Sequence, residues 1–572
     1  MTQMDLHRVF ELQYQASRAQ VDVPLLVRRE RLLRMQKLLD EHGPVLAAAV
    51  QADFGMRSPR LTEMVELFVL RNLLKHTLRH LARWSGRQRV RTPLMLMPGR
   101  GWIERQPLGV VGVISPWNYP VQLALGPAIT ALAAGNRVML KPSELTPHTS
   151  AQLAALVGQF FAPEEFAVIE GDVSVATQFS GLHFDHLLFT GSTAVGRRVA
   201  QAAAAHLTPT TLELGGKSPC IVSTDCDLKE AALKIAHGKL VNAGQTCIAP
   251  DYVLLPRGQE AEFAEAFRAA AQRLFPRFAG NPDYAAILTK RHLARLRQML
   301  RQAQGMGAHV EWMEDGGASH EGADMAWDDA VERQMAPALV FNATSQMQLM
   351  QEEIFGPILP VISYDRLDDV VSAINAGPRP LALYWFGRDE KVRDAVLSRT
   401  ISGGVTVNDT LLHFAHENLP FGGVGDSGWG AYHSEQGFAR LSHQKAVFVQ
   451  SRWSGASMLY PPYGARCRRA SVNGLYLEAC RPHSGRETAP CAGGRFQTGP
   501  ADHRRTCRLP FGSAPCRLCR STVAGRARLL RSAKCFATPR SRRTENLDSQ
   551  QVDRAGFASR PIGPPLYGAR TE

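Results

Sequence analysis

The chain has 572 residues, of which 45% are hydrophobic and 21% are charged, so it holds enough apolar material for more than one core. This composition excludes collagen-like, coiled-coil and wholly disordered proteins. There is no run of about 18 uncharged apolar residues, and charged residues such as Asp5, Arg8 and Glu11 interrupt the N-terminal segment. We therefore expect a cytoplasmic protein with no membrane span.

The net charge of +14 comes from one part of the chain. Residues 465–572 contain 20 Arg and one Lys against 7 acidic residues, which leaves 45 basic and 45 acidic residues before them. Cysteine is also uneven, because the first 464 residues hold only Cys220, Cys226 and Cys247. Three scattered cysteines are typical of a reduced cytosolic protein in which a thiol can be catalytic.

Residues 465–572 are rich in Arg and Cys and show no sustained apolar period. We expect this tail to be disordered, and we hypothesise that it is translated from a shifted reading frame, because 20 Arg against one Lys reflects codon composition. The alternative is a polybasic arm that binds nucleic acid or anionic lipid. Cys516 and Cys519 are spaced like zinc ligands, but the flanking Cys507 and Cys535 are poorly spaced, so we expect no metal site.

Helical patterns come first in the chain. Apolar residues recur at sevens over residues 24–50, with charged residues on the opposite face, which predicts an amphipathic helix. A further helix is predicted over residues 62–84 and an extended segment over residues 92–106.

Apolar, β-branched runs then alternate with helical segments. The first set of predicted strands comprises residues 110–115, 137–140, 166–170, 186–190 and 210–214. The intervening helices are predicted over residues 151–161 and 195–205. The second set of predicted strands comprises residues 220–223, 252–255, 338–341, 358–362, 381–386 and 405–407. Continuous apolar strands separated by helices predict two doubly wound α/β domains, whose ligands bind at the carboxyl ends of the strands.

Cys247 is the first candidate catalytic residue, because small and polar residues over 242–246 precede it and leave room for a ligand. A nucleophilic cysteine must be exposed to its substrate and have an accessible thiolate. Taken alone, Cys247 would be better explained as a small buried residue, since free cysteine is among the most buried residue types.

Two further candidates lie at the ends of predicted strands. Glu213 ends an apolar strand and precedes two glycines, where poor solvation raises the pKa of a carboxylate toward the range useful for a general base. Its alternative is a structural salt bridge, with Lys217 as the partner. Asn118 lies in a proline-flanked turn after a strand, and its amide suits an oxyanion hole. The alternative for Asn118 is a purely local role in the turn.

Seven ordered motifs resemble those of the aldehyde dehydrogenase superfamily. They are Pro116-Trp117-Asn118, Leu140–Glu144, Phe189–Gly196, Leu212–Lys217, Gly244–Cys247, Glu352–Pro357 and Leu419–Gly423. The short N-terminus, residues 245–252 and 405–409, and the Pro-Pro-Tyr-Gly motif ending at Gly464 resemble the class-3-like branch, in particular the bacterial coniferyl aldehyde dehydrogenases.

The resemblance implies NAD(P)-dependent oxidation of an aldehyde to a carboxylic acid. Cys247 would attack the aldehyde carbon, and the Asn118 amide with the Cys247 backbone N–H would hold the oxyanion of the thiohemiacetal. Glu213 would then activate the water that hydrolyses the thioester. By the same likeness the substrate is an aromatic aldehyde such as coniferaldehyde, which gives ferulate. Benzaldehyde-type and medium-chain aliphatic aldehydes remain alternatives.

The predicted cofactor site lacks the usual Gly-x-Gly-x-x-Gly fingerprint. Gly191, Ser192 and Gly196 instead follow a strand and open a helix, so backbone N–H groups can meet a pyrophosphate, although a plain tight turn would look the same. By resemblance, Lys141 and Glu144 face the adenosine ribose. By the same resemblance, Glu353 and Phe355 hold the nicotinamide ribose and ring, and Trp117 is a further cofactor-binding residue. Glu144 should repel a 2′-phosphate and favour NAD, whereas Lys141 acts in the opposite direction and leaves NADP possible.

The resemblance also implies a domain plan and a homo-oligomer, a dimer or a dimer of dimers. Residues 1–213 form the NAD(P)-binding domain, with residues 92–106 contributing to a small β oligomerisation element. Residues 214–410 form the catalytic domain, and residues 411–464 form the oligomerisation and C-terminal segment. Two other classes stay open: an NAD-independent thiol acyltransferase or hydrolase, and a polybasic nucleic-acid-binding protein.

Overall fold

The computed structural model describes residues 5–313, 329–454 and 460–461. The chain divides into two compact units, Met1–Leu477 and Glu478–Glu572, and every described residue belongs to the first. The tail at residues 465–572, with its predicted disorder and its paired cysteines, lies outside the described residues.

The first sheet has six strands in the order β15-β7-β6-β3-β4-β5. These strands are β3 (Val110–Ile114), β4 (Arg137–Lys141), β5 (Phe166–Val168), β6 (His186–Gly191), β7 (Thr210–Leu214) and β15 (Gly428–Trp429). Only β15 runs antiparallel to its neighbour, β7. The chain passes from β3 to β4 and β5 and returns to β6 on the other side of β3. The strand order therefore reverses between β3 and β6, where ligands of such sheets bind.

Alternate side chains of β3 explain why this sheet is covered on both faces. Val111 and Val113 join one buried cluster, whereas Val110 and Ile114 join another. The first face packs against α5, and the second packs against α1 and α7.

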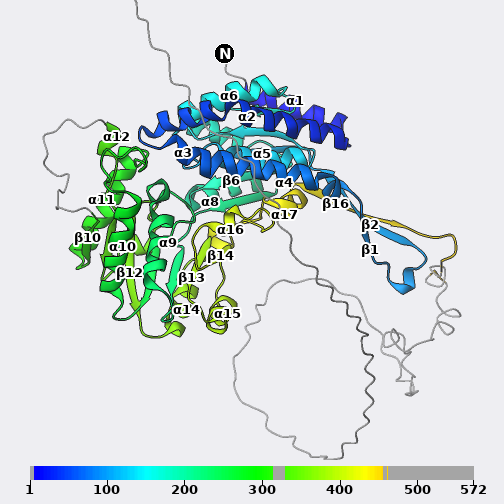
Figure 1. Ribbon diagram of the computed structural model, residues 1–572. Helices are drawn as coiled ribbons and strands as arrows, with labels where there is room; N and C mark the ends of the chain where they lie inside the picture. Colours follow the sequence, from blue (N-terminus) through cyan, green and yellow to red (C-terminus); the bar gives the residue numbers. More distant parts are fainter. Residues whose placement is uncertain (1–4, 314–328, 455–459, 462–572) are drawn as a thin grey trace, which may run out of the picture. The chain divides into compact units, whose positions relative to one another are not determined.

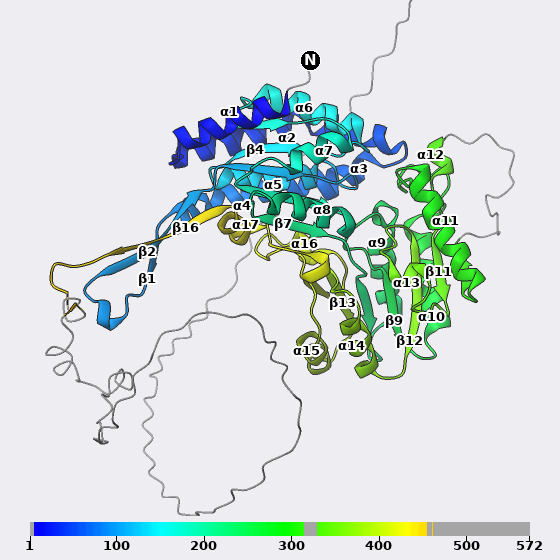
Figure 2. The same ribbon diagram turned by 180° about the vertical axis from the view of Figure 1, so that it is seen from behind.

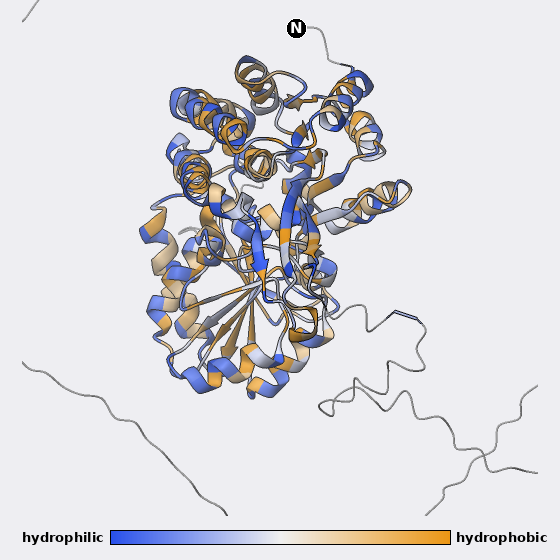
Figure 3. Cartoon of the chain, turned by 90° about the vertical axis from the view of Figure 1, so that its right-hand side faces the viewer, coloured by the Kyte–Doolittle hydropathy of each residue, from blue (hydrophilic) through white to orange (hydrophobic). Residues whose placement is uncertain are grey.

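The second sheet has seven strands in the order β10-β11-β12-β9-β8-β13-β14. These strands are β8 (Pro219–Val222), β9 (Tyr252–Pro256), β10 (His309–Trp312), β11 (Ala338–Phe341), β12 (Ile358–Tyr364), β13 (Ala382–Phe386) and β14 (Gly404–Val407). Except for antiparallel β10, its strands are parallel. Figure 3 shows hydrophobic residues along the strands and polar residues on the outer helices. The predicted pair of α/β sheets is confirmed.

A third sheet joins distant parts of the chain in the order β1-β2-β16. Its strands are β1 (Gln88–Val90), β2 (Arg100–Pro107) and β16 (Ser442–Val449). β16 runs antiparallel to β2 with Ser442 opposite Pro107 and Val449 opposite Arg100. The predicted small β element is therefore present, and Figures 1 and 2 show its strands side by side.

The helices complete both layers. Those in the first half are α1 (Leu6–Ala19), α2 (Leu25–Phe54), α3 (Pro59–Thr62), η1 (Glu63–Leu67), α4 (Phe68–Ser85), η2 (Leu94–Leu96), α5 (Gln122–Ala133), α6 (Pro147–Phe160), α7 (Val173–Ser180), α8 (Thr193–Ala204), α9 (Leu228–Leu240), η3 (Val241–Gly244) and α10 (Glu260–Leu274). Those that follow are α11 (Lys290–Gly305), α12 (Asp329–Glu332), α13 (Gln348–Gln351), α14 (Leu367–Ala376), α15 (Glu390–Arg399), α16 (Leu412–Ala415), η4 (Gly425–Ser427) and α17 (Ser434–Arg440). No helix in the described part of the chain combines the length and apolar character needed to cross a bilayer.

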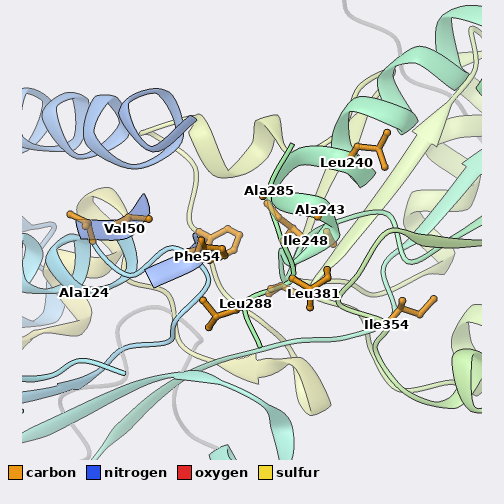
Figure 4. Packing of buried hydrophobic residues seen from close by; sticks show 14 of the residues in the cluster. Val50, Phe54, Ala124, Leu240, Ala243, Ile248, Ala285, Leu288, Ile354 and Leu381 are labelled. Carbon is orange, nitrogen blue, oxygen red and sulfur yellow. The ribbon is translucent and has the colours of Figure 1, made fainter. Parts of the chain in front are cut away.

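One hydrophobic cluster runs through both α/β sheets. Figure 4 shows part of this cluster, where Val50 and Phe54 of α2 face the region of Ile248 and Leu288. All four side chains are at most 5% exposed. Buried apolar area contributes roughly 25 cal/mol per Å², so this shared core couples the two sheets and fixes the groups between them.

Candidate active site

A cavity of about 630 Å³ opens at the carboxyl edge of the first sheet. Its walls begin at the ends of β3, β6 and β7, on both sides of the reversal in strand order. The predicted residues that line it are Trp117, Asn118, Gly191, Ser192, Glu213, Cys247, Glu353 and Phe355. The structure thus brings together all three predicted catalytic residues and five of the eight predicted cofactor residues.

The loop before Cys247 is fixed by buried amides. Gln245 is fully buried, and its amide donates to the carbonyls of Asn242 and Ala286 at 2.9 and 3.0 Å while accepting from the Leu288 N–H at 2.9 Å. Asn242 adopts the left-handed region with φ 51°, which asparagine tolerates better than most residues. Every polar group of the Gln245 amide therefore helps to hold the segment that presents the thiol.

Direct hydrogen bonds join the Asn118 turn to this cysteine loop. Asn118 Nδ2 donates to the Gln245 carbonyl at 3.1 Å, and Asn242 Nδ2 donates to the Asn118 carbonyl at 3.1 Å. The Tyr119 hydroxyl lies 2.5 Å from Thr246 Oγ1. An asparagine amide has two N–H donors, so one remains for a ligand after the bond to Gln245.

The Cys247 side chain is a free thiol that is partly buried in the cavity wall. Burial, together with the nearby carboxyl groups of Glu353 and Glu213, raises the pKa of Cys247 to about 12. The resting thiol is therefore protonated at neutral pH, and it needs a local base or a bound cation to become a nucleophile.

Glu213 lies near the end of β7, opposite Gly428 of β15. Its side chain is 3% exposed, and neither carboxyl oxygen has a hydrogen-bond partner in the described part of the chain. Burial raises the pKa of Glu213 well above its usual value. The alternative of a salt bridge with Lys217 is wrong, because Lys217 Nζ instead pairs with Asp251.

Gly428 allows β15 to approach Glu213 closely. Its φ is +117°, and a Cβ at this position would lie 1.9 Å from the Leu212 carbonyl oxygen. Only glycine fits this close approach of two backbones. The strand that covers Glu213 therefore depends on a residue far along the sequence.

A network of charged side chains holds the backbone of residues 352–354. Lys217 Nζ donates to the Glu352 carbonyl at 3.1 Å, Arg295 Nη1 donates to the Glu353 carbonyl at 3.2 Å, and Asp251 Oδ1 accepts from the Ile354 N–H at 3.1 Å. Burial, together with the charge of Asp251, raises the pKa of Glu353 to about 8. The carboxyl group of Glu353 is consequently positioned in the cavity with a pKa near neutrality.

Aromatic contacts extend this network to the Asn118 turn. Phe355 has a positive φ of 53°, and its ring meets Trp117 edge to face at 5.3 Å. His292 stacks on Trp117 with ring centroids 4.9 Å apart. Burial, together with Arg291 and Arg295, lowers the pKa of His292 to about 4, so this cavity-lining imidazole is neutral at pH 7.

The N-terminus of α8 borders the cavity where a pyrophosphate is predicted. Ser192 is the N-cap of α8 and accepts from the Val195 N–H at 3.4 Å, while Gly191, Thr193 and Ala194 line the cavity. Free N–H groups at a helix N-terminus attract anions. Gly196 is not in the cavity wall. A Cβ there would lie 2.6 Å from Leu214 Cδ2, so Gly196 lets α8 pack closely on β7.

Lys141 ends β4 and Glu144 follows it at the same edge of the sheet, but neither residue lines the cavity. Lys141 is buried and donates to the Pro142 carbonyl at 2.6 Å, and its Nζ lies 3.8 Å from Glu144 Oε2. Burial lowers the pKa of Lys141, whereas Glu144 and Asp172 oppose that shift. The buried ammonium group at the predicted adenosine position is therefore paired with Glu144 and lies within the electrostatic influence of Asp172.

Several residues of the site were missed by the sequence analysis. His292 and Arg295 come from α11, which carries none of the seven motifs. Asp251 lies within residues 245–252, which resemble the class-3-like branch, but no role was predicted for it. Their importance arises from contacts between elements far apart in the chain. The place of Lys217 at the end of a predicted strand indicates that it has a charged partner, but only the fold shows that this partner is Asp251.

The fold and cavity define a doubly wound, dinucleotide-binding class of α/β protein. The aldehyde dehydrogenase family model matches residues 1–447. The chain is 47% identical over 443 residues to a probable coniferyl aldehyde dehydrogenase of Caulobacter vibrioides, which covers 77% of this chain and 90% of that protein. It is 45% identical over 443 residues to the coniferyl aldehyde dehydrogenase of Pseudomonas sp. strain HR199, with the same shares covered.

A solved structure described as the substrate-bound state of Staphylococcus aureus AldH has a TM-score of 0.75 at 35% identity. The match covers 82% of this chain and 98% of that one. The chain therefore belongs to the aldehyde dehydrogenase family, and its class of activity is the NAD(P)-dependent oxidation of an aldehyde.

Proposed function

We propose that the protein oxidises an aromatic aldehyde of the coniferaldehyde type to the corresponding acid through a covalent intermediate on Cys247. The observation that carries this proposal is the single cavity that holds a thiol, a neutral amide donor and a desolvated carboxyl group, namely Cys247, Asn118 and Glu213. Relatives at 45 and 47% identity carry the coniferyl aldehyde name, which supports the substrate class.

The chain's residues divide the chemistry between them. The Cys247 thiol passes its proton to water in the cavity, and Sγ attacks the carbonyl carbon, while the free N–H of the Asn118 amide and the Cys247 backbone N–H hold the oxyanion of the thiohemiacetal. NAD(P), when bound, supplies the hydride acceptor that makes the oxidation possible. Glu213 then accepts a proton from water, the resulting hydroxide attacks the thioester carbon, and the C–S bond breaks to release the acid and the thiol.

The residues of the cavity suit the pyrophosphate and the nicotinamide side of a dinucleotide. Gly215 lines the cavity next to Glu353, and a Cβ at this position would lie 1.8 Å from Glu353 Oε2. The absence of a side chain at Gly215 therefore leaves room for the Glu353 carboxyl group. Ser192 and the N–H groups that follow it would hold the pyrophosphate, and Glu353 and Phe355 would hold the ribose and ring on the nicotinamide side. A volume of about 630 Å³ lies within the range of typical cofactor sites.

We propose NAD rather than NADP as the preferred cofactor. Glu144 and Asp172 both lie within electrostatic reach of Lys141, so the predicted adenosine position carries two negative charges against one positive charge. A 2′-phosphate would meet net repulsion there. Glu144→Gln should lower KM for NADP more than KM for NAD.

The substrate proposal is tested by NADH formation with coniferaldehyde, benzaldehyde and hexanal. We expect the highest kcat/KM with coniferaldehyde and no turnover in Cys247→Ala. Cys226→Ala is the matched control, because Cys226 is also a free thiol but does not line the active-site cavity. Hexanal as the best substrate would refute the aromatic class, and full turnover by Cys247→Ala would refute the nucleophile.

We further propose a cytoplasmic homodimer built on the β1-β2-β16 sheet. The free thiols of Cys220, Cys226 and Cys247 suit a reducing compartment. The sheet and its connecting turn carry large exposed apolar side chains, such as Leu94 at 86% and Phe448 at 47% exposed. Sedimentation of the parent and of Phe448→Glu tests this, because the charged variant should be monomeric and a dimeric variant would contradict the proposal.

A further inference from the structure

A buried ion pair lies beside the Asn118 turn but outside the cavity wall. Arg57 and Glu66 are both fully buried, and Arg57 Nη2 lies 2.6 Å from Glu66 Oε1. Glu66 lies in η1, a π-helical turn between α3 and α4, and such turns occur often at functional sites. Replacing a buried ion pair by apolar residues is often neutral or stabilising, so stability alone does not explain this one.

Both members of the pair bind the backbone of the Asn118 turn. Arg57 Nη1 donates to the Asn118 carbonyl at 2.7 Å. Glu66 Oε2 accepts from the Val121 N–H at 2.9 Å and from the Gln122 N–H at 3.0 Å. The ion pair therefore holds the turn at both ends, before and after the start of α5.

The same guanidinium group also contacts the side chain that links the turn to the cysteine loop. Arg57 lies over the Tyr119 ring at 5.2 Å, and the Tyr119 hydroxyl bonds Thr246, the residue before Cys247. On its other side Arg57 lies over the Phe54 ring at 4.7 Å. The guanidinium is thus restrained by two rings, one carboxylate and one carbonyl, and it has little freedom to move.

We propose that Arg57 and Glu66 are positioning residues that hold the Asn118 amide in place to donate to the oxyanion. This inference rests on the proposed function of Asn118. An oxyanion donor acts only within roughly 2.7–3.1 Å of the charge, and a misplacement of about 1 Å can cost a hundredfold in rate. Loosening the turn therefore lowers kcat although neither residue touches substrate.

The test uses the full chain and two conservative variants. Arg57→Lys keeps the charge but loses the planar fork that reaches Asn118 and Glu66 together. Glu66→Gln keeps the size of the side chain but replaces one carboxylate oxygen by an NH₂ group. Whichever oxygen is replaced, either Arg57 or the two backbone N–H groups lose their acceptor. Each variant should lower kcat about tenfold or more, within the range that misplacement can cause, and leave KM for NAD unchanged.

Glu165→Gln is the matched control. Glu165 pairs with Arg31 at 3.0 Å, Arg31 is also buried, and neither residue lines the cavity. This control should lower the thermal midpoint while kcat stays unchanged. The iodoacetamide alkylation rate of Cys247, a reaction that forms no oxyanion, should be equal in the parent and in Arg57→Lys.

The double variant Arg57→Met with Glu66→Leu removes both buried charges together, so that neither charge is left unpaired in the core. It should fold and still show the lowered kcat. A folded double variant with parental kcat would overturn the inference, as would single variants whose kcat matches that of Glu165→Gln.

Asn118→Ala separates this inference from the proposed function. If Arg57 acts through Asn118, Arg57→Lys lowers kcat in the parent but has no further effect in Asn118→Ala. An equal loss in both backgrounds would overturn the positioning role and leave the oxyanion role intact. Parental kcat in Asn118→Ala alone would instead refute the proposed function of Asn118, and the positioning role with it.

Discussion

Replacing Glu213 by Gln isolates the second half of the proposed reaction. The structure leaves both Glu213 carboxyl oxygens without a hydrogen-bond partner in the described part of the chain and buries the side chain to 3% exposure. Gln has nearly the same size and removes only the ability to accept a proton. General-base catalysis contributes roughly a hundredfold to ten-thousandfold, so we expect kcat to fall by that factor, or about 2.7–5.5 kcal/mol.

Rapid mixing of Glu213→Gln with NAD and coniferaldehyde is the assay. The thioester forms without Glu213, so NADH should appear in a burst equal to the concentration of active sites and then rise slowly. The pH profile should change too, because burial raises the pKa of Glu213 and the parent kcat should rise with pH as the group ionises. The kcat of Glu213→Gln should not show this rise with pH. Loss of the burst would place Glu213 in the first half of the reaction, and parental kcat would refute its role as base.

Four further predictions follow from the same geometry. Asn118→Ala removes the free N–H donor and should lower kcat roughly a hundredfold to a thousandfold in NADH assays, with parental kcat as the contradicting result. Because the pKa of Glu353 is raised, the parent should lose stability between pH 4.5 and about 8 as this carboxyl group ionises, and Glu353→Gln should not show this loss. The free energy of unfolding in urea, measured across that pH range, would contradict this if it changed equally with pH in the parent and the variant. Gly215→Ala would put a Cβ 1.8 Å from Glu353 Oε2 and should raise KM for NAD more than it lowers kcat, so an unchanged KM would show that this wall does not meet the cofactor. Truncation after Gly464 should leave kcat, the thermal midpoint and binding to nucleic acid or anionic vesicles unchanged, and loss of any of them would assign a role to the tail.

The parallel strands and the catalytic candidates could be predicted because local sequence determines them. Strands such as β3 and β6 are continuous apolar runs, and their carboxyl ends carry Asn118 and Gly191 in short motifs. Parallel pairing then brings such ends to one edge of a sheet. Cys247, Glu213 and Asn118 therefore meet in one cavity, as the sequence predicts.

Other features depend on contacts that sequence patterns do not carry. The helix predicted over residues 62–84 is interrupted by the π-helical turn η1, where Glu66 turns toward Arg57. The sequence analysis did not predict α1, β10 or the two-residue strand β15. β15 is too short to show a period, and it forms because Gly428 can approach Leu212.

The side chains that hold the site are equally hidden in the sequence. Lys217 is next to the glycines after β7, yet its partner is Asp251 and not Glu213. Arg295 reaches the Glu353 carbonyl from a helix 58 positions away. Such pairings are properties of the packed fold, and only the structure reveals them.

The most direct test of the central claim is mass spectrometry of Glu213→Gln quenched in acid after brief mixing with NAD and coniferaldehyde. We expect a feruloyl thioester on the peptide that contains Cys247 and an unmodified peptide that contains Cys226. No adduct on Cys247 in an enzyme that still releases NADH, or an adduct on a different residue, would contradict it.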